Sequence, residues 1–413
     1  MIHTMKFHLV FVFLFTALLF AGDTVRPGLE PLENEFRIPT DEEKQLVMAL
    51  KTPLIEAKNV LAPLQKWFDG RLLSTQGKKE EALKTWKDGL KCMDDLKPLP
   101  QPKWQDMPDA SFTVLTTLNL PSYRSLRFDV VQWKVANLNQ YGGVIRPASP
   151  KPTDKLPVIL YCHGAAFGIP TYFLGWLAEL AEQGYVIACP AMRGEPLFQQ
   201  DIEIKGKLIK CEGDIENLEG EVDDCLSMLR ATWKLPYAQP DSFAMIGHSF
   251  GAGVGLLAAA RAGERCKAVV SYDAWLVTPQ RYYWDRMARG ANNWLSWADF
   301  CNQPVDVQLR GLMTRSIVHN AEKLSAKVLL FIGGAYEGSV FHQSHDDLIS
   351  QFKRLNKHYS YHVMPNGGHN FVLYTESKPA QDALKIQTEF LDKYYPPAGK
   401  NSKGQANQLN SND

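Results

Sequence analysis

Apolar positions recur along this chain with three different spacings, and each spacing predicts a different kind of structure. From residue 41 to about 96 they recur every three or four positions, which predicts helices. From 111 to 145 apolar and polar residues alternate, with many β-branched and aromatic residues, which predicts two or three antiparallel strands. Prolines crowd the stretch 96–108, where they disfavour both helix and central strand. We therefore expect a helical N-terminal segment over 22–105 and a second domain over 106–397.

After Pro152 the pattern becomes a series of short apolar runs separated by helical patterns. The runs cover residues 158–162, 185–189, 243–246, 268–272, 328–332 and 359–363. Short, mostly apolar runs of this kind indicate burial on both faces, so they predict an α/β fold with a mostly parallel, doubly wound sheet. Between the first two runs, Trp176, Leu177 and Leu180 share one helix face, and Gly184 follows where that helix would end.

The two ends of the chain predict segments outside the fold. An apolar run from Phe7 to Phe20 follows Lys6 and precedes Ala21, which is typical of a secretory signal peptide over 1–21. An uncleaved anchor is the alternative, but the run is shorter than the roughly 20 apolar residues that span a bilayer. We expect export to the periplasm or the medium, with no stable membrane span after cleavage. The polar tail over 398–413 is expected to be disordered.

The charge balance and the cysteine content argue against nucleic-acid binding, a disulfide framework and a zinc site. The 413 residues include 45 basic and 45 acidic ones, with no long block of either sign, so nucleic acid is not an expected partner. Seven irregularly spaced cysteines predict neither a disulfide framework nor a zinc site. Cys162 and Cys189 close apolar runs and are expected to be buried and reduced, whereas a bridge among the others stays open.

A candidate nucleophile lies in the sequence Gly247-His248-Ser249-Phe250-Gly251. This stretch comes directly after the apolar run 243–246 and directly before a helical pattern. A turn from strand to helix that is sharp enough to expose a serine hydroxyl strains the backbone, and flanking glycines remove the clashes. G-x-S-x-G alone is a weak motif, but in this context it predicts that Ser249 is a catalytic nucleophile.

A serine on such a turn is followed along the chain first by an acid and then by a histidine. His369 follows the last apolar run and two glycines, and it is the only histidine with the right place in this order. Glu337 is the only carboxylate in the loop 333–340, and it would accept a hydrogen bond from His369 Nδ1. The other carboxylates considered are Asp273, which follows the strand after the nucleophile, and Asp346 and Asp347 in the next helix.

Two backbone N–H groups are expected to bind the oxyanion. One is the N–H of Phe250, directly after the nucleophile. The other comes from the small-residue loop 163–168, where we expect Ala165, with Ala166 as the alternative. One such donor stabilises the transition state by about 3 kcal/mol in comparable hydrolases. No metal or organic cofactor is required for this chemistry.

The stretch 275–315 interrupts the alternation of runs and helices. It crowds many tryptophans and tyrosines into a short span, and an aromatic insertion after a strand is a candidate cap over an active site. The same aromatic residues could instead pack only against the domain. Both interpretations stay open.

These residues together resemble the α/β-hydrolase superfamily. Within it, the chain is similar to the branch that joins dienelactone-hydrolase-like esterases to the catalytic domains of prolyl oligopeptidases and dipeptidyl peptidases, over about 156–395. The stretches that carry the resemblance are Arg193-Gly194, Glu221-Val-Asp-Asp224, Leu235 to Asp241, and Gly334-x-x-Glu337-x-x-Val340, in which Glu replaces the usual Asp.

The resemblance implies a serine hydrolase that forms an acyl-enzyme. The peptidases carry a β-propeller ahead of the catalytic domain, whereas the pattern here predicts a helical segment and a few strands. Their usual G-x-S-x-G-G ends in Gly251-Ala252 here, so we expect cleavage of a small-molecule or polymer-borne ester. A peptidase of the prolyl-oligopeptidase or dipeptidyl-peptidase type is the first alternative. A catalytically inactive binding module is the second, although an intact Ser, His and carboxylate argue against it.

Overall fold

The computed structural model describes most of the chain between residues 62 and 398. The described ranges are 62–93, 97–107, 109–120, 122–164, 167–200, 202–278 and 305–398. The predicted signal peptide, most of the predicted cap and nearly all of the predicted disordered tail therefore lie outside the described residues.

The chain divides into two compact units. The first contains Met1–Asp95, Gln280–Gly290 and Tyr336–Gln343, and the second contains the rest. In the first unit, α3 (Ala62–Thr75) and α4 (Lys79–Met93) form a helix pair, as the spacing of apolar residues predicts. The turn between them uses Gly77 at a φ of 74°.

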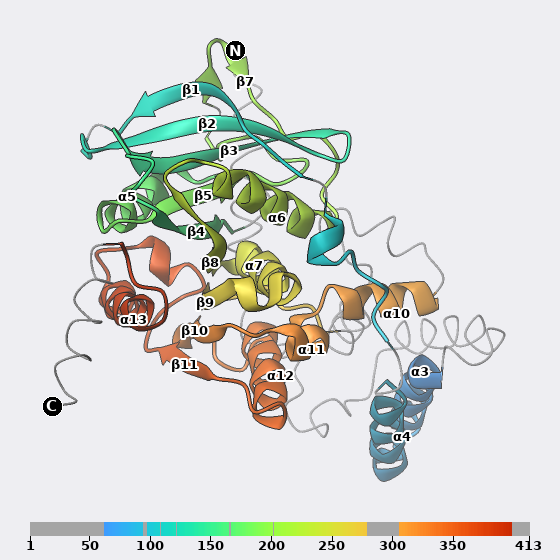
Figure 1. Cartoon of the computed structure of the whole chain (residues 1–413). Helices are drawn as coiled ribbons and strands as arrows, with labels where there is room; N and C mark the ends of the chain where they lie inside the picture. The colour runs from blue at the N-terminus through green and yellow to red at the C-terminus, as the bar shows by residue number, and fades with distance from the viewer. Residues whose placement is uncertain are drawn as a thin grey trace, which may run out of the picture. The chain divides into compact units, whose positions relative to one another are not determined.

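The second unit is built on a nine-stranded sheet in the order β1-β2-β3-β5-β4-β8-β9-β10-β11 (Figure 1). The strands are β1 (Thr113–Asn119), β2 (Leu126–Val135), β3 (Leu138–Pro147), β4 (Leu156–Cys162), β5 (Val186–Pro190), β8 (Ala238–His248), β9 (Cys266–Tyr272), β10 (Lys327–Gly333) and β11 (Tyr359–Met364). From β1 to β5 the neighbours pair antiparallel, and from β5 to β11 they pair parallel. The predicted α/β fold, with antiparallel strands ahead of a parallel sheet, is confirmed.

Helices cover both faces of this sheet, as a doubly wound fold requires (Figure 1). On one face, α5 (Leu174–Glu182) and α13 (Lys378–Tyr394) share a buried core with Tyr161 of β4. On the other face lie α6 (Gly220–Trp233) and α7 (Ser249–Ala262), and Cys225 of α6 has its Sγ 3.7 Å from Sγ of Cys162. Alternate residues of β4 therefore face opposite layers. The remaining helices are α10 (Val305–Thr314), α11 (Ile317–Asn320) and α12 (Val340–Arg354).

Two predicted details are confirmed in these layers. Gly184 follows α5 at a φ of 110°, a conformation that favours glycine, so the helix ends where the sequence predicts. Cys162 and Cys189 are buried free thiols. Within the described part of the chain, no helix is long and apolar enough to cross a membrane.

Two features differ from the sequence-based expectation. A small hairpin of β6 (Glu203–Ile204) and β7 (Lys207–Leu208) was not expected, because strands of two residues are too short to show an alternating pattern. Strand β8 begins at Ala238, five residues before the apolar run. The run did not include this part of the strand because Gln239, Pro240 and Asp241 interrupt the apolar pattern and are partly or fully exposed.

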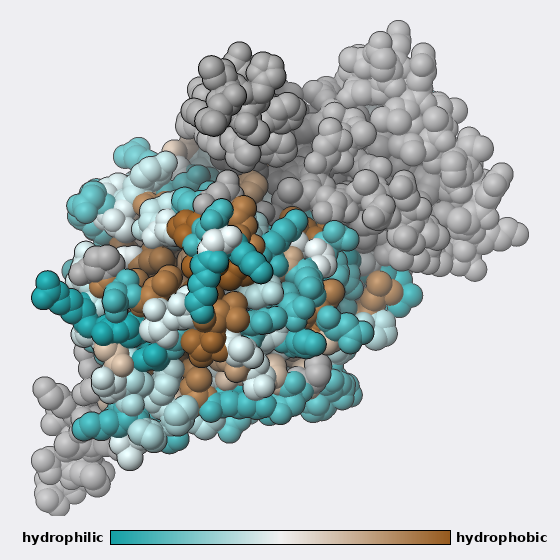
Figure 2. All heavy atoms as spheres, turned by 90° about the horizontal axis from the view of Figure 1, so that it is seen from above, coloured by the Kyte–Doolittle hydropathy of each residue, from teal (hydrophilic) through white to brown (hydrophobic). Residues whose placement is uncertain are grey.

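Some large hydrophobic side chains are exposed on the surface at the antiparallel end of the sheet. Figure 2, which views the molecule from above, shows hydrophobic side chains gathered between hydrophilic ones. Large apolar side chains that are exposed include Val114 of β1 and Leu208 of β7. Lys205 of the small hairpin donates to the main-chain oxygen of Leu115, so this hairpin is bound to the edge strand.

Candidate active site

The predicted nucleophile lies at the junction of β8 and α7. Ser249 is the first residue of α7 and has a φ of 52°, a left-handed conformation that is uncommon for a residue other than glycine. Gly247 is needed before it because a Cβ atom there would lie 2.6 Å from Cα of Ala252. The turn is thus sharp and tightly packed, and it places Ser249 at the carboxyl edge of the parallel strands.

Gly251 is needed after the serine for a different reason, which is close packing of α7 against the end of β4. A Cβ atom on Gly251 would lie 2.1 Å from the main-chain oxygen of His163 and 2.3 Å from that of Cys162. Both neighbours are backbone atoms, so neither can rotate away. The glycine therefore sets the separation between the nucleophile turn and the loop that follows β4.

We expect Gly251→Ala to lower the free energy of unfolding by about 3 kcal/mol, at the upper end of what overpacking usually produces. Urea denaturation measures this. Gly175→Ala in α5 is the matched control, because, among the described residues, the only atom near a Cβ at this position is Tyr123 Oη, at 3.8 Å. The control should be stabilised by about 0.5–1 kcal/mol, because alanine favours helices over glycine. Equal effects of the two substitutions would contradict the packing argument.

His369 lies against the nucleophile. Its Nε2 is 2.8 Å from Ser249 Oγ, although 120 residues separate the two in sequence. A tight turn after β11 presents the histidine, since Gly367 N donates to Met364 O and Phe371 N donates to Gly368 O. The structure thus brings together the serine and the histidine that the sequence predicts as nucleophile and base.

The surroundings of His369 keep its imidazole neutral. The side chain is buried, and burial lowers its pKa well below the usual value because the charged form loses hydration. Positive charge on His248 or His345 would lower this pKa further. A neutral imidazole is the form that can accept the serine proton.

The predicted acid, Glu337, follows β10 in the expected loop. Its side chain is exposed, and it belongs to the first unit whereas His369 belongs to the second. The start of the same loop does reach the histidine turn, because Ala335 N donates to Gly367 O over 2.9 Å. Whether Glu337 is the acid stays a prediction.

Asp273 is a second carboxylate at this edge of the sheet. It follows β9, is completely buried, and has a φ of 47°. Its Oδ1 accepts a hydrogen bond from Gly333 N over 2.8 Å. Gly333 in turn packs on the histidine turn, since a Cβ there would lie 2.3 Å from Gly367 O and 2.7 Å from Gly368 O. A short series of contacts therefore connects Asp273 to the backbone that carries His369.

The predicted oxyanion donors are described only in part. Phe250 lies in the first turn of α7, where main-chain N–H groups have no partner within the helix. Ala165 and its alternative Ala166 lie outside the described residues. The loop between them and β4 includes Gly164, where a Cβ would lie 2.6 Å from His248 Nδ1. Its backbone is therefore packed directly against the residue before the nucleophile.

A buried pair of a histidine and a glutamate lies at the base of the same loop. His163 Nε2 is 3.0 Å from Glu195 Oε2, and both side chains are buried. Burial by itself lowers the pKa of His163, but the Glu195 carboxylate outweighs it and the pKa is raised above its usual value. Sequence reasoning did not assign a role to this pair. The only signal was a histidine directly after an apolar run, next to a glycine.

Two of the stretches that carry the family resemblance form a buried ion-pair cluster. The main-chain N and the guanidinium of Arg193 donate to Asp224. The Glu221 carboxylate accepts from three main-chain N–H groups, those of Glu216, Asn217 and Glu219. These acidic groups are thus engaged within the fold and hold the loop before α6.

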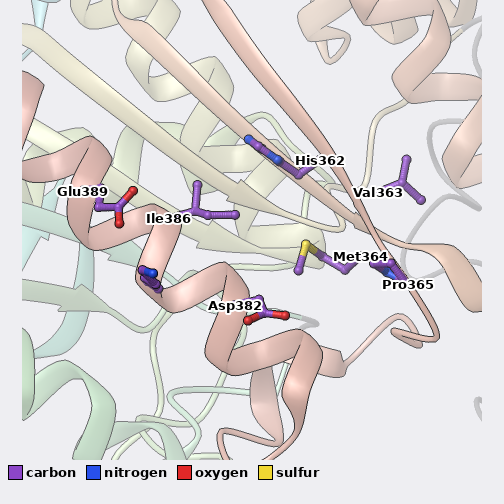
Figure 3. Close-up of a pocket in the computed structure, with 8 residues that line it drawn as sticks. His362, Val363, Met364, Pro365, Asp382, Ile386 and Glu389 are labelled. Atoms are coloured by element: carbon purple, nitrogen blue, oxygen red, sulfur yellow. The ribbon is translucent and has the colours of Figure 1, made fainter.

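Within the described ranges, no group of three or more His, Cys, Asp or Glu side chains is placed to hold an ion. A cavity of about 450 Å³ lies between β11 and α13 (Figure 3). His362 and Met364 of the strand face Asp382 and Ile386 of the helix across it. Neither Ser249 nor His369 lines this cavity.

Comparisons with known proteins identify one family and several similar solved structures. Residues 172–396 match the prolyl oligopeptidase family of peptidases, and no curated protein matches the sequence. This match covers most of the region whose motifs predicted the resemblance.

Three solved structures are among those to which this chain is similar. An acylaminoacyl peptidase of Pyrococcus horikoshii is 16% identical over 69% of this chain and 42% of its own, with a TM-score of 0.46. An acetyl xylan esterase from Paenibacillus sp. R4 is 18% identical over 74% and 99%, with a TM-score of 0.47. A dienelactone hydrolase-like phosphotriesterase from metagenomic libraries is 13% identical over 65% and 99%, with a TM-score of 0.44. The chain spans less than half the length of the peptidase.

Proposed function

The chain belongs to the prolyl oligopeptidase family and is a hydrolase with the α/β-hydrolase fold, and on that premise we propose that it is a secreted serine hydrolase that cleaves carboxylic esters. The observation that carries the proposal is the 2.8 Å contact between Ser249 Oγ and His369 Nε2 at the head of α7. Export rests on the N-terminal apolar run alone.

The reaction follows from the positions of the two side chains. His369 Nε2 accepts the hydroxyl proton of Ser249 while Oγ attacks the acyl carbon of the ester. The main-chain N–H of Phe250 and that of Ala165 stabilise the oxyanion. The protonated imidazole then donates its proton to the departing alcohol, and water, activated by the same imidazole, cleaves the acyl-enzyme and frees Ser249.

Peptide-bond hydrolysis is the second candidate, and the family match favours it. A peptidase that trims free N-termini needs carboxylates available to bind the substrate amine. Glu221 and Asp224 are engaged with backbone N–H groups and with Arg193, so these two do not supply such a site. Together with Ala252 after the nucleophile motif, this favours esters over peptides. The catalytically inactive binding module is the least favoured, because the serine and histidine are in contact.

The proposal is tested with matched chromogenic substrates. We expect the mature protein to hydrolyse short p-nitrophenyl esters much faster than aminoacyl or prolyl p-nitroanilides, with Ser249→Ala as the background. Faster turnover of the anilides would make it a peptidase. No turnover of either substrate, together with no labelling of Ser249 by a fluorophosphonate probe, would leave the binding module.

The acid limb of the pH profile is a further prediction. The base must be unprotonated, and burial lowers the pKa of His369, so kcat/KM should fall to half its maximum only below about pH 6.5, the ordinary value for histidine. The rate of ester cleavage between pH 4 and 8, followed at the isosbestic wavelength of p-nitrophenol, measures it. A midpoint above that value would mean that a carboxylate close to the imidazole outweighs burial.

A further inference from the structure

His248, the residue before the nucleophile, makes a contact that the proposed reaction does not yet use. Its side chain is buried, and its Nε2 lies 3.1 Å from the main-chain oxygen of His369. The two rings lie near each other, with centroids 5.5 Å apart. The other edge of the His248 ring packs on Gly164, the first residue after His163 in the loop predicted to form the oxyanion hole.

The chemistry of the acceptor determines the state of this imidazole. A carbonyl oxygen can only accept a hydrogen bond, so Nε2 of His248 carries the proton and Nδ1 carries the lone pair. Burial lowers the pKa of His248 to about 4, so the ring is neutral over the range in which a serine hydrolase works. A neutral donor can hold His369 without adding a positive charge beside the catalytic base.

Two consecutive residues therefore hold His369 at two points. Ser249 Oγ contacts its ring Nε2, and His248 Nε2 donates to its main-chain oxygen. We propose that His248 is a positioning residue, which fixes the backbone of His369 so that the imidazole stays within hydrogen-bond distance of the nucleophile. This inference rests on the proposed serine-hydrolase function.

Catalysis depends steeply on such placement, because a displacement of about 1 Å can lower a rate about 100-fold. Gly333 and Ala335 contact the histidine turn at Gly367 and Gly368, whereas the bond from His248 acts on His369 itself. Without that bond, the main-chain oxygen of His369 no longer accepts the hydrogen bond from His248 Nε2, although both residues remain buried. The ring then samples positions away from Ser249.

The experiment compares three variants by their rate of ester turnover and their rate of phosphonylation by a fluorophosphonate. His248→Phe and His248→Leu fill the site without a donor, and His248→Gln keeps an amide N–H near the position of Nε2. We expect the first two to lower kcat about 10- to 100-fold with KM within about twofold of the wild type, in line with a misplaced base. His248→Gln should recover most of that loss, and the phosphonylation rates should follow the same order.

Several outcomes would overturn the inference. Wild-type rates in both His248→Phe and His248→Leu would show that the bond is not needed. Equal losses in all three variants would show that the donor does not matter and that the effect comes from the packing of the native side chain. Imidazole ¹⁵N chemical shifts give an answer that does not depend on activity: His248 should be neutral and protonated on Nε2 at pH 7. Protonation on Nδ1 would rule out the bond, whereas failure of the proposed function would appear separately, as a wild-type protein that neither cleaves esters nor reacts with the probe.

Discussion

Ser249→Ala and His369→Ala will each lower kcat for the best ester substrate by about 10⁴-fold or more, with little change in KM. The alanine at 249 has no atom to attack the acyl carbon, and the alanine at 369 leaves the hydroxyl without a base 2.8 Å away. Because the two groups act as a unit, the double variant should be hardly slower than the slower single variant. Steady-state kinetics of all three variants measure this.

Ser227→Ala is the control for the removal of a buried hydroxyl elsewhere. Ser227 is completely buried in α6, and its hydroxyl donates a long hydrogen bond of 3.5 Å to the main-chain oxygen of Lys134 in β2. This variant should retain the wild-type kcat. Substantial ester turnover by Ser249→Ala would refute the nucleophile, and additive losses in the double variant would refute a shared role for the pair.

Asp273→Asn will lower kcat more than Glu337→Gln. The imidazole of His369 is buried, so a carboxylate that binds it must be buried as well. Asp273 is completely buried, whereas Glu337 is exposed. An amide cannot stabilise the imidazolium that forms during attack, and the same change in a comparable triad lowers kcat by about 10⁴-fold. An exposed carboxylate interacts weakly through water, so its neutralisation should have a small effect.

The pair of variants separates catalysis from folding. The asparagine introduced by Asp273→Asn keeps an oxygen that can accept the hydrogen bond from Gly333 N, so the thermal midpoint of this variant should change little. Kinetics and thermal denaturation of both variants are read together. A large loss of kcat in Glu337→Gln, with Asp273→Asn near the wild type, would establish the acid that the G-x-x-E-x-x-V stretch predicts.

The sequence is most informative where a local pattern has a single physical explanation. Mostly apolar runs indicate burial on both faces, and the runs in β4, β5, β8, β9 and β10 are buried, so these parallel strands could be predicted one by one. The run in β11 includes Ser360 and His362 and is only half buried, because this strand lies at the edge of the sheet. The glycines around Ser249 are required by backbone clashes, so the nucleophile turn could also be predicted. The order of serine and histidine along the chain then pointed to His369.

The contacts that complete the site depend on tertiary structure. Glu337 was predicted from its position in one loop. Whether a carboxylate faces His369, however, depends on how loops from different strands pack. Asp273 lies 60 residues before Gly333 in the sequence, yet it accepts a hydrogen bond from Gly333, which packs on the turn that carries His369. The bond from His248 to His369 joins residues 121 positions apart, and no periodicity reports it. Burial of a strand and clashes within a turn depend on residues that are close in sequence. The sequence by itself therefore determined the strands of the sheet and the position of the nucleophile. Hydrogen bonds between distant residues arise only when the sheet brings strand ends together, and therefore only the tertiary structure decided how the base is held.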